Sequence, residues 1–310
     1  MNTVRSGTYA EELARLEDED LYRRRRIVET ACAPEIEIDG RRLVSFCSND
    51  YLGLASHPEV VTAFKTATDT YGCGAGASHL ITGHTRAHHE LEESLAEFTN
   101  RPRALTFSTG YMANLGLITT LAKRGDCVFE DRYNHASLVD AALLSGARLV
   151  RYPHADTNAL REKLVTLSGH RRKVIATDGV FSMDGDIAPL TGLAGLAREQ
   201  EATLVVDDAH GFGVVGTEGR GSLAAAGIGH DESILMMGTL GKAFGVFGAF
   251  VAGSDELIEL LINRGRTYIY TTAPPAAIAV AAKTAVSIAV REHWRREKLR
   301  ALVTSFREAA

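Results

Sequence analysis

The sequence has few cysteines, no long apolar run and no excess of basic residues, and each absence excludes a class of protein. Four cysteines occur among 310 residues without a CxxC pair, which predicts reduced, mostly packed thiols in a cytosolic protein. These cysteines are Cys32, Cys47, Cys73 and Cys127. The formal net charge of −5 does not indicate the excess of positive charge that is typical of nucleic-acid-binding proteins.

Membrane insertion is also not expected. The longest apolar stretch, from Ala276 to Val290, is interrupted by Lys283 and is too short to span a bilayer. The polar, acidic N-terminus lacks the apolar core of a secretory signal. With 45% hydrophobic and 24% charged residues, the chain is expected to be a soluble, cytoplasmic, globular protein.

Short apolar runs alternate with helix-like segments from Arg103 onward. Alternation of this kind predicts an α/β fold with a mostly parallel central sheet and helices on both faces. The predicted strands are 105–107, 127–129, 149–152, 174–177, 203–206, 234–237 and 249–252. The helix-like segments include 111–122 and 137–144.

The two ends of the chain differ from this middle part. Residues 8–30 predict a charged helix that carries the basic run Arg23–Arg26, and the alternation around Asp39-Gly40 predicts a hairpin within 35–46. From about Pro275 the pattern is helical, with an apolar stripe. We therefore divide the chain into an N-terminal segment, 1–45, a large domain, 46–275, and the beginning of a long helix, 276–310. The stripe consists of Leu299, Leu302, Val303 and Phe306.

Residues that follow the apolar runs are candidates for one shared site, because open α/β sheets bind ligands beyond the carboxyl ends of their strands. The candidates are Gly110-Tyr111, His135, Asp178 with Ser182, Asp207 with His210, and Thr239 with Lys242.

Lys242 lies in the glycine-rich stretch GTLGKAFG, directly after an apolar strand. A lysine in such a turn is often a solvated surface charge, but at a strand end it can form a Schiff base with an aldehyde. If the aldehyde is pyridoxal 5'-phosphate (PLP), the site also needs an acid for the ring nitrogen, an aromatic face and donors for the phosphate. Asp207 is a suitable acid.

The other strand-end residues each have two interpretations. Gly110 and Tyr111 open a helix whose N-terminus suits a phosphate, with Ser108, Thr109 or Thr239 as hydroxyl donors, although Ser108 or Thr109 could instead cap that helix. His135 could stack on the ring or cap the next helix. His210 could donate to the ring oxygen, and Asp208 is expected to be structural. We expect no metal site at His79, His84, His88 and His89, because they lack a matching carboxylate or cysteine arrangement.

Seven spaced blocks together resemble one family, the α-oxoamine synthases, which are PLP enzymes of the aspartate-aminotransferase fold. The resemblance covers nearly the whole chain. The blocks are SFCSNDYLGLASHPEV, GCGAGASHLITGHTRAHHELEESLAEF, FSTGYMAN, DRYNHASLVDA, TDGVFSMDGDIAPL, VVDDAHGFGVVGTEGRG and GTLGKAFG. Within the family, the chain looks most like the members that condense L-alanine with a pimeloyl thioester, bound to coenzyme A or to acyl carrier protein, in biotin biosynthesis.

The resemblance implies a role for each matching residue. Lys242 would hold the cofactor covalently, Asp207 would pair with the ring nitrogen and His210 would contact the ring oxygen. His135 would stack over the ring with Ser182 close to it, and Gly110, Tyr111 and Thr239 would surround the phosphate. Asn49 and Arg23 would lie near the substrates. The resemblance also implies a cytoplasmic homodimer.

Relatives normally continue into a small C-terminal domain that supplies an arginine for the amino acid's carboxylate. We therefore expect that domain to be absent from this chain, which puts its activity with alanine in doubt. A sister synthase that uses glycine with a short acyl-CoA would share all seven blocks. An ordinary aminotransferase is disfavoured by SNDYLG and HLITGHTRAHHELE, and a cofactor-less subunit is disfavoured by the presence of Lys242.

Overall fold

The seven predicted apolar runs form one sheet in the computed structural model, which describes residues 8–167, 169 and 171–310. The strand order is β3-β9-β8-β7-β6-β4-β5. Only β9 runs antiparallel to its neighbours, and the other adjacent pairs are parallel, which confirms the mostly parallel sheet. The strands are β3 (Arg103–Phe107), β4 (Cys127–Asp131), β5 (Arg148–Tyr152), β6 (Lys173–Asp178), β7 (Thr203–Asp207), β8 (Ile234–Thr239) and β9 (Ala249–Gly253).

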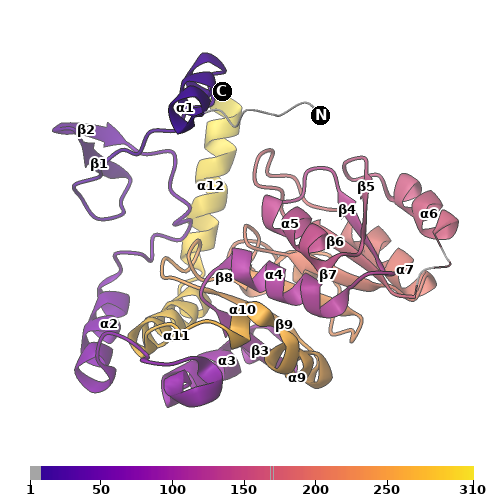
Figure 1. Cartoon of the computed structure of the whole chain (residues 1–310). Coiled ribbons are helices and arrows are strands. Elements are labelled where there is room, and N and C mark those ends of the chain that lie inside the picture. The colour runs from indigo at the N-terminus through magenta and orange to yellow at the C-terminus, as the bar shows by residue number, and fades with distance from the viewer. Residues whose placement is uncertain (1–7, 168, 170) are drawn as a thin grey trace. The chain divides into compact units, whose positions relative to one another are not determined.

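Helices cover both faces of this sheet (Figure 1). Successive residues of a strand point to opposite faces, so Phe129 packs in one hydrophobic core and its neighbour Val128 packs in the other. The first core is completed by α2 (Pro58–Tyr71), α3 (Arg86–Thr99), α6 (Thr157–Thr166), α7 (Leu190–Glu199) and α11 (Ala276–Arg291). The second is completed by α4 (Gly110–Leu121), α5 (Ala136–Ser145), α9 (Asp255–Arg264) and α10 (Arg266–Ile269). The short elements η1 (His79–Gly83), η2 (Thr217–Gly219) and α8 (Ser222–Ala225) lie in the connections.

The chain forms two units, Met1–Ser48 and Asn49–Ala310. In the first unit, β1 (Glu35–Ile38) and β2 (Arg41–Val44) pair in an antiparallel hairpin. Asp39 and Gly40 both have positive φ, +52° and +70°, as a two-residue type I′ turn requires. The predicted hairpin is therefore confirmed. The proposed domain boundaries at 45/46 and 275/276 stay predictions.

The N-terminal helix is shorter than predicted. α1 spans Tyr9–Asp18 and begins with a capping box between Thr8 and Glu11. Its last turn closes through a bond from the Leu21 N–H to the Leu16 carbonyl, and Asp20 adopts φ +54°, which is incompatible with a continuing right-handed helix. The prediction of a helix over 8–30 was therefore wrong, and the basic run at 23–26 lies beyond the helix.

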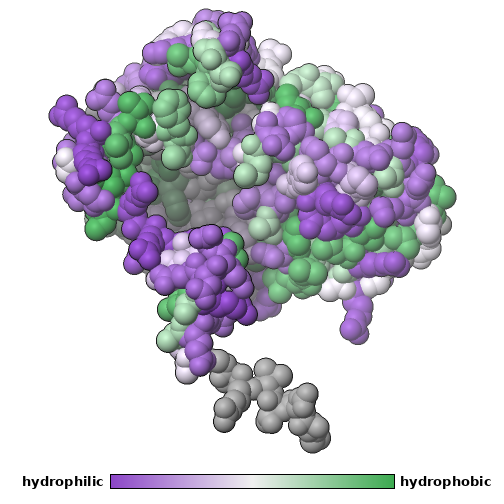
Figure 2. Space-filling model, turned by 90° about the horizontal axis from the view of Figure 1, so that it is seen from above, coloured by the Kyte–Doolittle hydropathy of each residue, from purple (hydrophilic) through white to green (hydrophobic). Residues whose placement is uncertain are grey.

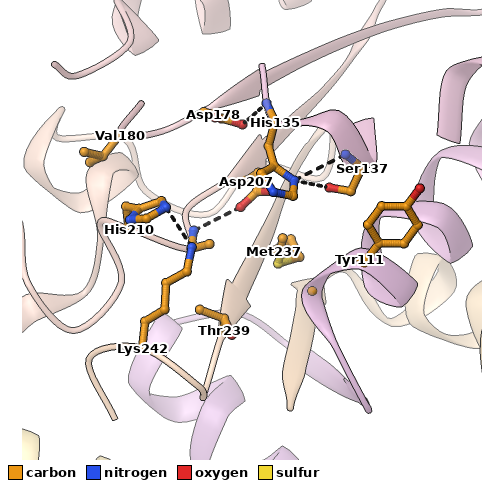
Figure 3. Close-up of a pocket in the computed structure, with 12 residues that line it drawn as sticks. Tyr111, His135, Ser137, Asp178, Val180, Asp207, His210, Met237, Thr239 and Lys242 are labelled. Atoms are coloured by element: carbon orange, nitrogen blue, oxygen red, sulfur yellow. Dashed lines mark hydrogen bonds between the residues drawn. The ribbon is translucent and has the colours of Figure 1, made fainter. Parts of the chain in front are cut away.

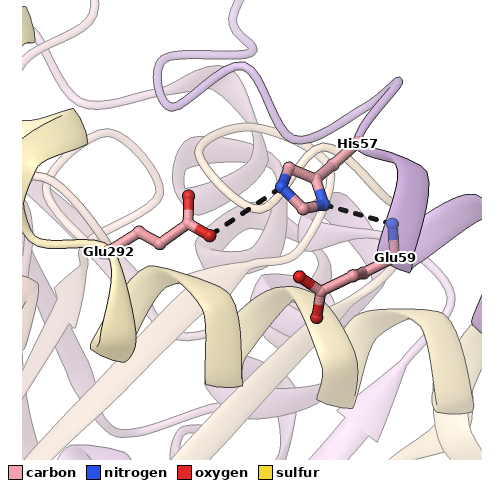
Figure 4. Close-up of side chains that lie close together, drawn as sticks. All are labelled: His57, Glu59 and Glu292. Atoms are coloured by element: carbon pink, nitrogen blue, oxygen red, sulfur yellow. Dashed lines mark hydrogen bonds and ion pairs between the residues drawn. The ribbon is translucent and has the colours of Figure 1, made fainter.

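The predicted long C-terminal helix is two helices, α11 and α12 (Trp294–Ala309), which are separated at Glu292 with ψ 59°. Three side chains that could in principle hold a metal ion come together beside this break, and their nitrogen and carboxylate oxygen atoms lie within 4.8 Å of one another (Figure 4). They belong to His57, Glu59 and Glu292. Arg291 lies 2.7 Å from the Glu59 carboxylate, and Arg295 lies 2.8 Å from that of Glu292. Because guanidinium groups already neutralise both carboxylates, we interpret the group as an ion-pair network that fixes the helix junction.

Hydrophobic and hydrophilic residues are interspersed on the surface in Figure 2. Among the exposed apolar side chains are three members of the predicted C-terminal stripe, Leu302 (59% exposed), Val303 (43%) and Phe306 (63%). Three of the four cysteines are exposed and only Cys127 is buried, so the prediction of mostly packed thiols was wrong. Within the described part of the chain, every helix is too short or too polar to cross a membrane.

The loop after β8 returns tightly against the segment before α2. Gly245 in this loop has φ +66°, and a Cβ atom there would lie 2.2 Å from the Ala55 backbone nitrogen. Since neither backbone can move away cheaply, a side chain at this position would bring both strain and overlap. The glycine thus sets the path of the loop that carries Lys242.

We expect Gly245→Ala to lower the free energy of unfolding by about 3 kcal/mol or more. The matched control is Gly241→Ala, because a Cβ at Gly241 would have no neighbour closer than 3.7 Å and its φ is not in the positive range. That control should stay within about 1 kcal/mol of the unchanged protein. Urea denaturation followed by circular dichroism measures both, and equal losses in the two variants would contradict the close approach.

Candidate active site

A cavity of about 180 Å³ lies at the carboxyl ends of the parallel strands (Figure 3). It is lined by residues at or after the carboxyl ends of β3, β4, β6, β7 and β8, as the common edge of such strands requires. Eight residues predicted for the site line it: Gly110, Tyr111, His135, Asp178, Asp207, His210, Thr239 and Lys242. The remaining lining residues are Ser137, Val180, Ala209 and Met237.

Lys242 takes part in a chain of hydrogen bonds. Its Nζ lies 2.7 Å from His210 Nε2, and His210 Nδ1 lies 2.7 Å from the Tyr51 hydroxyl oxygen. The Tyr51 hydroxyl donates to Asn49 Oδ1 at 3.1 Å. Because that proton is used on Asn49, His210 donates from Nδ1 to Tyr51, which leaves Nε2 as the acceptor for the lysine amine. These hydrogen bonds together fix the tautomer of His210.

Burial lowers the pKa of Lys242, partly offset by the nearby carboxylates of Asp207 and Asp178. Burial, together with the positive charge of Lys242, also lowers the pKa of His210 to about 4. The histidine is therefore neutral near pH 7, and the lysine amine loses its proton more readily than an exposed one. An amine in this state can act as a nucleophile or as a base.

Asp207 is buried at the end of β7, where its carboxylate accepts two hydrogen bonds. Asn114 Nδ2 donates to Oδ2 at 2.6 Å, and the Ala209 N–H donates to Oδ1 at 3.0 Å. Burial raises the pKa of Asp207, and burial together with repulsion from Asp207 raises the pKa of Asp178 to about 8. Two carboxyl groups of raised pKa at one cavity favour a ligand that brings a positive charge or a proton to them.

Asn114 and Ser137 were missed by the sequence analysis. Asn114 lies fully buried in α4, and its amide donates to both Ser137 Oγ (2.8 Å) and Asp207. One signal was available, because Asn114 is the only amide in the otherwise apolar or small face of this helix and is four residues after Gly110. Tyr51 gave no such signal, since its contact with His210 spans 159 residues.

His135 has one of the two roles considered for it, the helix cap. Its Nδ1 accepts from the Ser137 N–H at 3.3 Å and lies 2.7 Å from Ser137 Oγ, so it caps α5. Its ring also lines the cavity (Figure 3). Stacking on a cofactor ring stays a prediction.

The N-terminus of α4 opens at the cavity through Gly110 and Tyr111. The first N–H groups of a helix have no intrahelical acceptor and attract anions. Thr109 caps this helix by accepting from the Met112 N–H, as the capping interpretation predicted. The Thr239 hydroxyl donates to the Gly248 carbonyl at 3.0 Å, so in this structure it closes its own loop.

Three predicted residues lie outside the cavity lining. Ser182 lines an adjoining groove, Asn49 is connected to His210 through Tyr51, and Arg23 belongs to the first unit. Their contacts with cofactor and substrates stay predictions. Asp208, predicted to be structural, accepts a hydrogen bond from the Ser222 N–H at 2.6 Å and does not line the cavity.

The histidines near η1 pack against one another. His79 Nδ1 lies 3.0 Å from His84 Nδ1, and the His79 ring stacks on Tyr268 at 4.8 Å between centroids. His88 Nε2 lies 2.8 Å from the Pro274 carbonyl oxygen. Burial, with the nearby histidines, lowers the pKa of His79 to about 3. These contacts fix the 79–88 segment against α10 and the beginning of α11.

The cavity fits PLP in the types of group it offers. The cofactor has an aldehyde for an amine, a ring nitrogen for a carboxylate and a phosphate for helix N–H groups, and Lys242, Asp207 and the α4 N-terminus are their counterparts. The mostly parallel sheet with helices on both faces, together with this cavity, defines a PLP-dependent transferase of fold type I.

Comparison with known proteins places the chain more narrowly. The family model for aminotransferase class I and II matches residues 41–309. The 8-amino-7-oxononanoate synthase of Nitrosococcus oceani is 56% identical over 299 residues, which are 96% of this chain and 79% of the relative. That of Methylococcus capsulatus is 58% identical over 301 residues, 97% of this chain and 78% of the relative. The chain belongs to the aminotransferase class I and II family and, within it, to the 8-amino-7-oxononanoate synthases.

Solved structures of related enzymes share the fold. A serine palmitoyltransferase from S. paucimobilis, with a bound PLP–myriocin adduct, has a TM-score of 0.88 and 32% identity over 94% of this chain and 74% of that one. An 8-amino-7-oxononanoate synthase from Francisella tularensis has a TM-score of 0.75 and 36% identity over 85% of this chain and 74% of that one. The predicted family, fold and cofactor are thereby confirmed.

Proposed function

We propose that this protein condenses L-alanine with a pimeloyl thioester to give 8-amino-7-oxononanoate, with release of carbon dioxide and the thiol, as a step in biotin biosynthesis. The observation that carries the proposal is the Lys242 amine, of lowered pKa, beside His210 and Asp207 in one cavity. The similarity to named 8-amino-7-oxononanoate synthases over 96% of the chain supports the choice of substrates.

PLP, when bound, supplies a carbonyl group that condenses with amines and a ring that withdraws electrons from the substrate carbon. Asp207 would hold a proton on the ring nitrogen, because its carboxylate is fixed by Asn114 and by the Ala209 N–H. Lys242 would hold the cofactor covalently. As a free amine, Lys242 would take the proton from the alanine Cα.

The neighbouring residues orient these groups. His210 keeps the Lys242 amine directed into the cavity, and Tyr51 keeps His210 in the tautomer that accepts from it. We expect His135 to cover one face of the cofactor ring and the α4 N-terminus, at Gly110 and Tyr111, to bind its phosphate. The Tyr111 hydroxyl donates to Asp140, so its ring is the part available to the cavity.

A substrate panel tests the function. The PLP-loaded protein is given alanine or glycine together with pimeloyl-CoA, acetyl-CoA or succinyl-CoA, and thiol release and carbon dioxide are measured. We expect both products to form in equal amounts, and fastest with alanine and pimeloyl-CoA. Preference for glycine with a short acyl-CoA would instead assign the protein to the sister reaction.

The predicted homodimer and cytoplasmic location remain proposals. They are supported by the family membership of the chain. Sedimentation equilibrium of the purified protein would test the first, and a protein that stays monomeric at assay concentrations would contradict it.

A further inference from the structure

A second hollow adjoins the cofactor cavity within the Asn49–Ala310 unit. It has a volume of about 480 Å³ and shares His210 and Val180 with the cavity that contains Lys242. A molecule that reacts beside Lys242 can therefore extend past His210 into this groove. The groove is lined by Tyr51, Val180, Phe181, Ser182, Gly185, His210, Val214, Val215, Leu299, Arg300, Val303, Thr304 and Arg307.

The lining combines an apolar body with two positive charges. Phe181, Val214 and Val303 provide apolar surface, and one face of α12 adds Arg300 and Arg307. Among the described residues, no carboxylate lies within ion-pair distance of either guanidinium. Two unpaired arginines beside an apolar surface favour a ligand that has an apolar chain and an anionic end.

Helix geometry places the charges along the groove. Leu299 and Arg307 are eight residues apart on α12, which corresponds to about 12 Å along the helix axis. Arg300 and Arg307 lie seven residues apart and thus on the same side of the helix. Both guanidinium groups can contact one carboxylate that enters between them. Alternatively, each can bind the carboxylate in turn at its own position along the helix.

We propose that this groove holds the acyl chain of the thioester substrate and that Arg300 and Arg307 bind the free carboxylate at its far end. The proposal rests on the proposed function, because a pimeloyl group has a reacting carbonyl at one end, five methylene groups and a carboxylate at the other. The reacting carbonyl lies beside Lys242, the methylene groups lie against Phe181, Val214 and Val303, and the carboxylate receives charge-assisted hydrogen bonds.

The arrangement makes the two arginines specificity-determining residues. An acyl chain of the same length without the carboxylate would fill the apolar part of the groove but leave both guanidinium groups unpaired. Because both guanidinium groups are exposed and stay hydrated without a carboxylate, the preference comes from the charge-assisted hydrogen bonds that only the carboxylate can accept. The groove therefore selects a dicarboxylic half-thioester over a simple fatty acyl thioester.

Equilibrium binding tests this without turnover. Isothermal titration of the PLP-loaded protein with pimeloyl-CoA and with heptanoyl-CoA, in the absence of any amino acid, compares two ligands that differ only in the terminal carboxylate. We expect pimeloyl-CoA to bind about tenfold tighter or more. In the double variant Arg300→Gln/Arg307→Gln, the two dissociation constants should agree within about threefold.

Lys298→Gln is the matched control, because Lys298 is an exposed basic residue of α12 that does not line the groove. It removes one positive charge from the same helix and should keep the preference for pimeloyl-CoA. Arg300 and Arg307 are themselves exposed, so the double variant is expected to fold, and its melting temperature checks this.

Equal binding of the two thioesters by the unchanged protein would overturn the proposal, as would a double variant that keeps the preference. The proposed function fails separately. If pimeloyl-CoA binds preferentially but alanine releases no thiol from it, the reaction is wrong while the carboxylate site stands.

Discussion

Replacing Lys242 by alanine is expected to abolish covalent attachment of PLP and to lower turnover by several orders of magnitude. The reason is that, among the residues that the structure describes, this is the only lysine amine lining the cavity, and it is also the group that we assign as base. Borohydride reduction of the loaded protein followed by peptide mapping measures the attachment. In the unchanged protein the label should fall on the peptide that contains Lys242.

The pH dependence of attachment gives a second readout for the same residue. Only the deprotonated amine attacks the aldehyde, so the rate rises with pH and levels off above the lysine pKa. Because burial lowers the pKa of Lys242, the plateau should begin below the value of about 10.4 that is usual for lysine.

Lys123→Ala is the control for both measurements, because Lys123 is exposed and does not line the cavity. It should leave attachment and its pH profile unchanged. A label on Lys123 or Lys173, or a plateau no lower than that of an exposed lysine, would show that the reactive amine is not the one in this cavity.

The sheet could be predicted from the sequence because each strand is short, apolar and separated from the next by a helix. Val174–Ile175 and Val205–Val206 are buried on both faces of the sheet, so their sequences are apolar without interruption. The candidate residues followed from the same fact, since Asp207 comes directly after such a run and His135 lies in the loop that follows another. A strand end is a local feature of a sequence.

Other features depend on contacts between distant segments. Tyr51 reaches His210 only in the folded chain, and Asn114 acts through a carboxylate on another strand. The end of α1 was missed for a different reason. Charged residues continue beyond α1 in a pattern that is compatible with a helix, and the helix ends because the backbone turns at Asp20. Ser182 was assigned by its place in a block, although its loop carries it into the adjoining groove.

Asp207→Asn is expected to lower kcat by about a hundredfold or more while PLP still attaches to Lys242. The amide cannot hold a proton on the ring nitrogen by charge, so the cofactor loses most of its power to withdraw electrons. Steady-state kinetics with alanine and pimeloyl-CoA measure turnover, and peptide mapping after reduction measures attachment.

Asp208→Asn is the control that separates this role from burial alone. Asp208 is adjacent and equally enclosed, but its carboxylate accepts from the Ser222 N–H and does not line the cavity. An asparagine there keeps an acceptor oxygen for that bond. Its kcat should remain within a few-fold of the unchanged protein, provided that its melting temperature shows it to be folded.

Removing the Asp207 charge should also be visible without any reaction. Burial and repulsion from Asp207 raise the pKa of Asp178 to about 8, so in the cofactor-free protein Asp178 binds its proton more tightly when folded than when unfolded. Such a group stabilises the fold at low pH, and that stability is lost as pH rises from about 4, its usual unfolded value, through the raised pKa. In Asp207→Asn the repulsion is gone, so the pKa of Asp178 falls, and the raised pKa of Asp207 itself no longer contributes. Both changes act in the same direction, so less stability should be lost between pH 5 and 8. Urea denaturation of the cofactor-free protein at several pH values measures this, and an unchanged slope together with near-normal kcat would assign Asp207 to structure instead of to the cofactor.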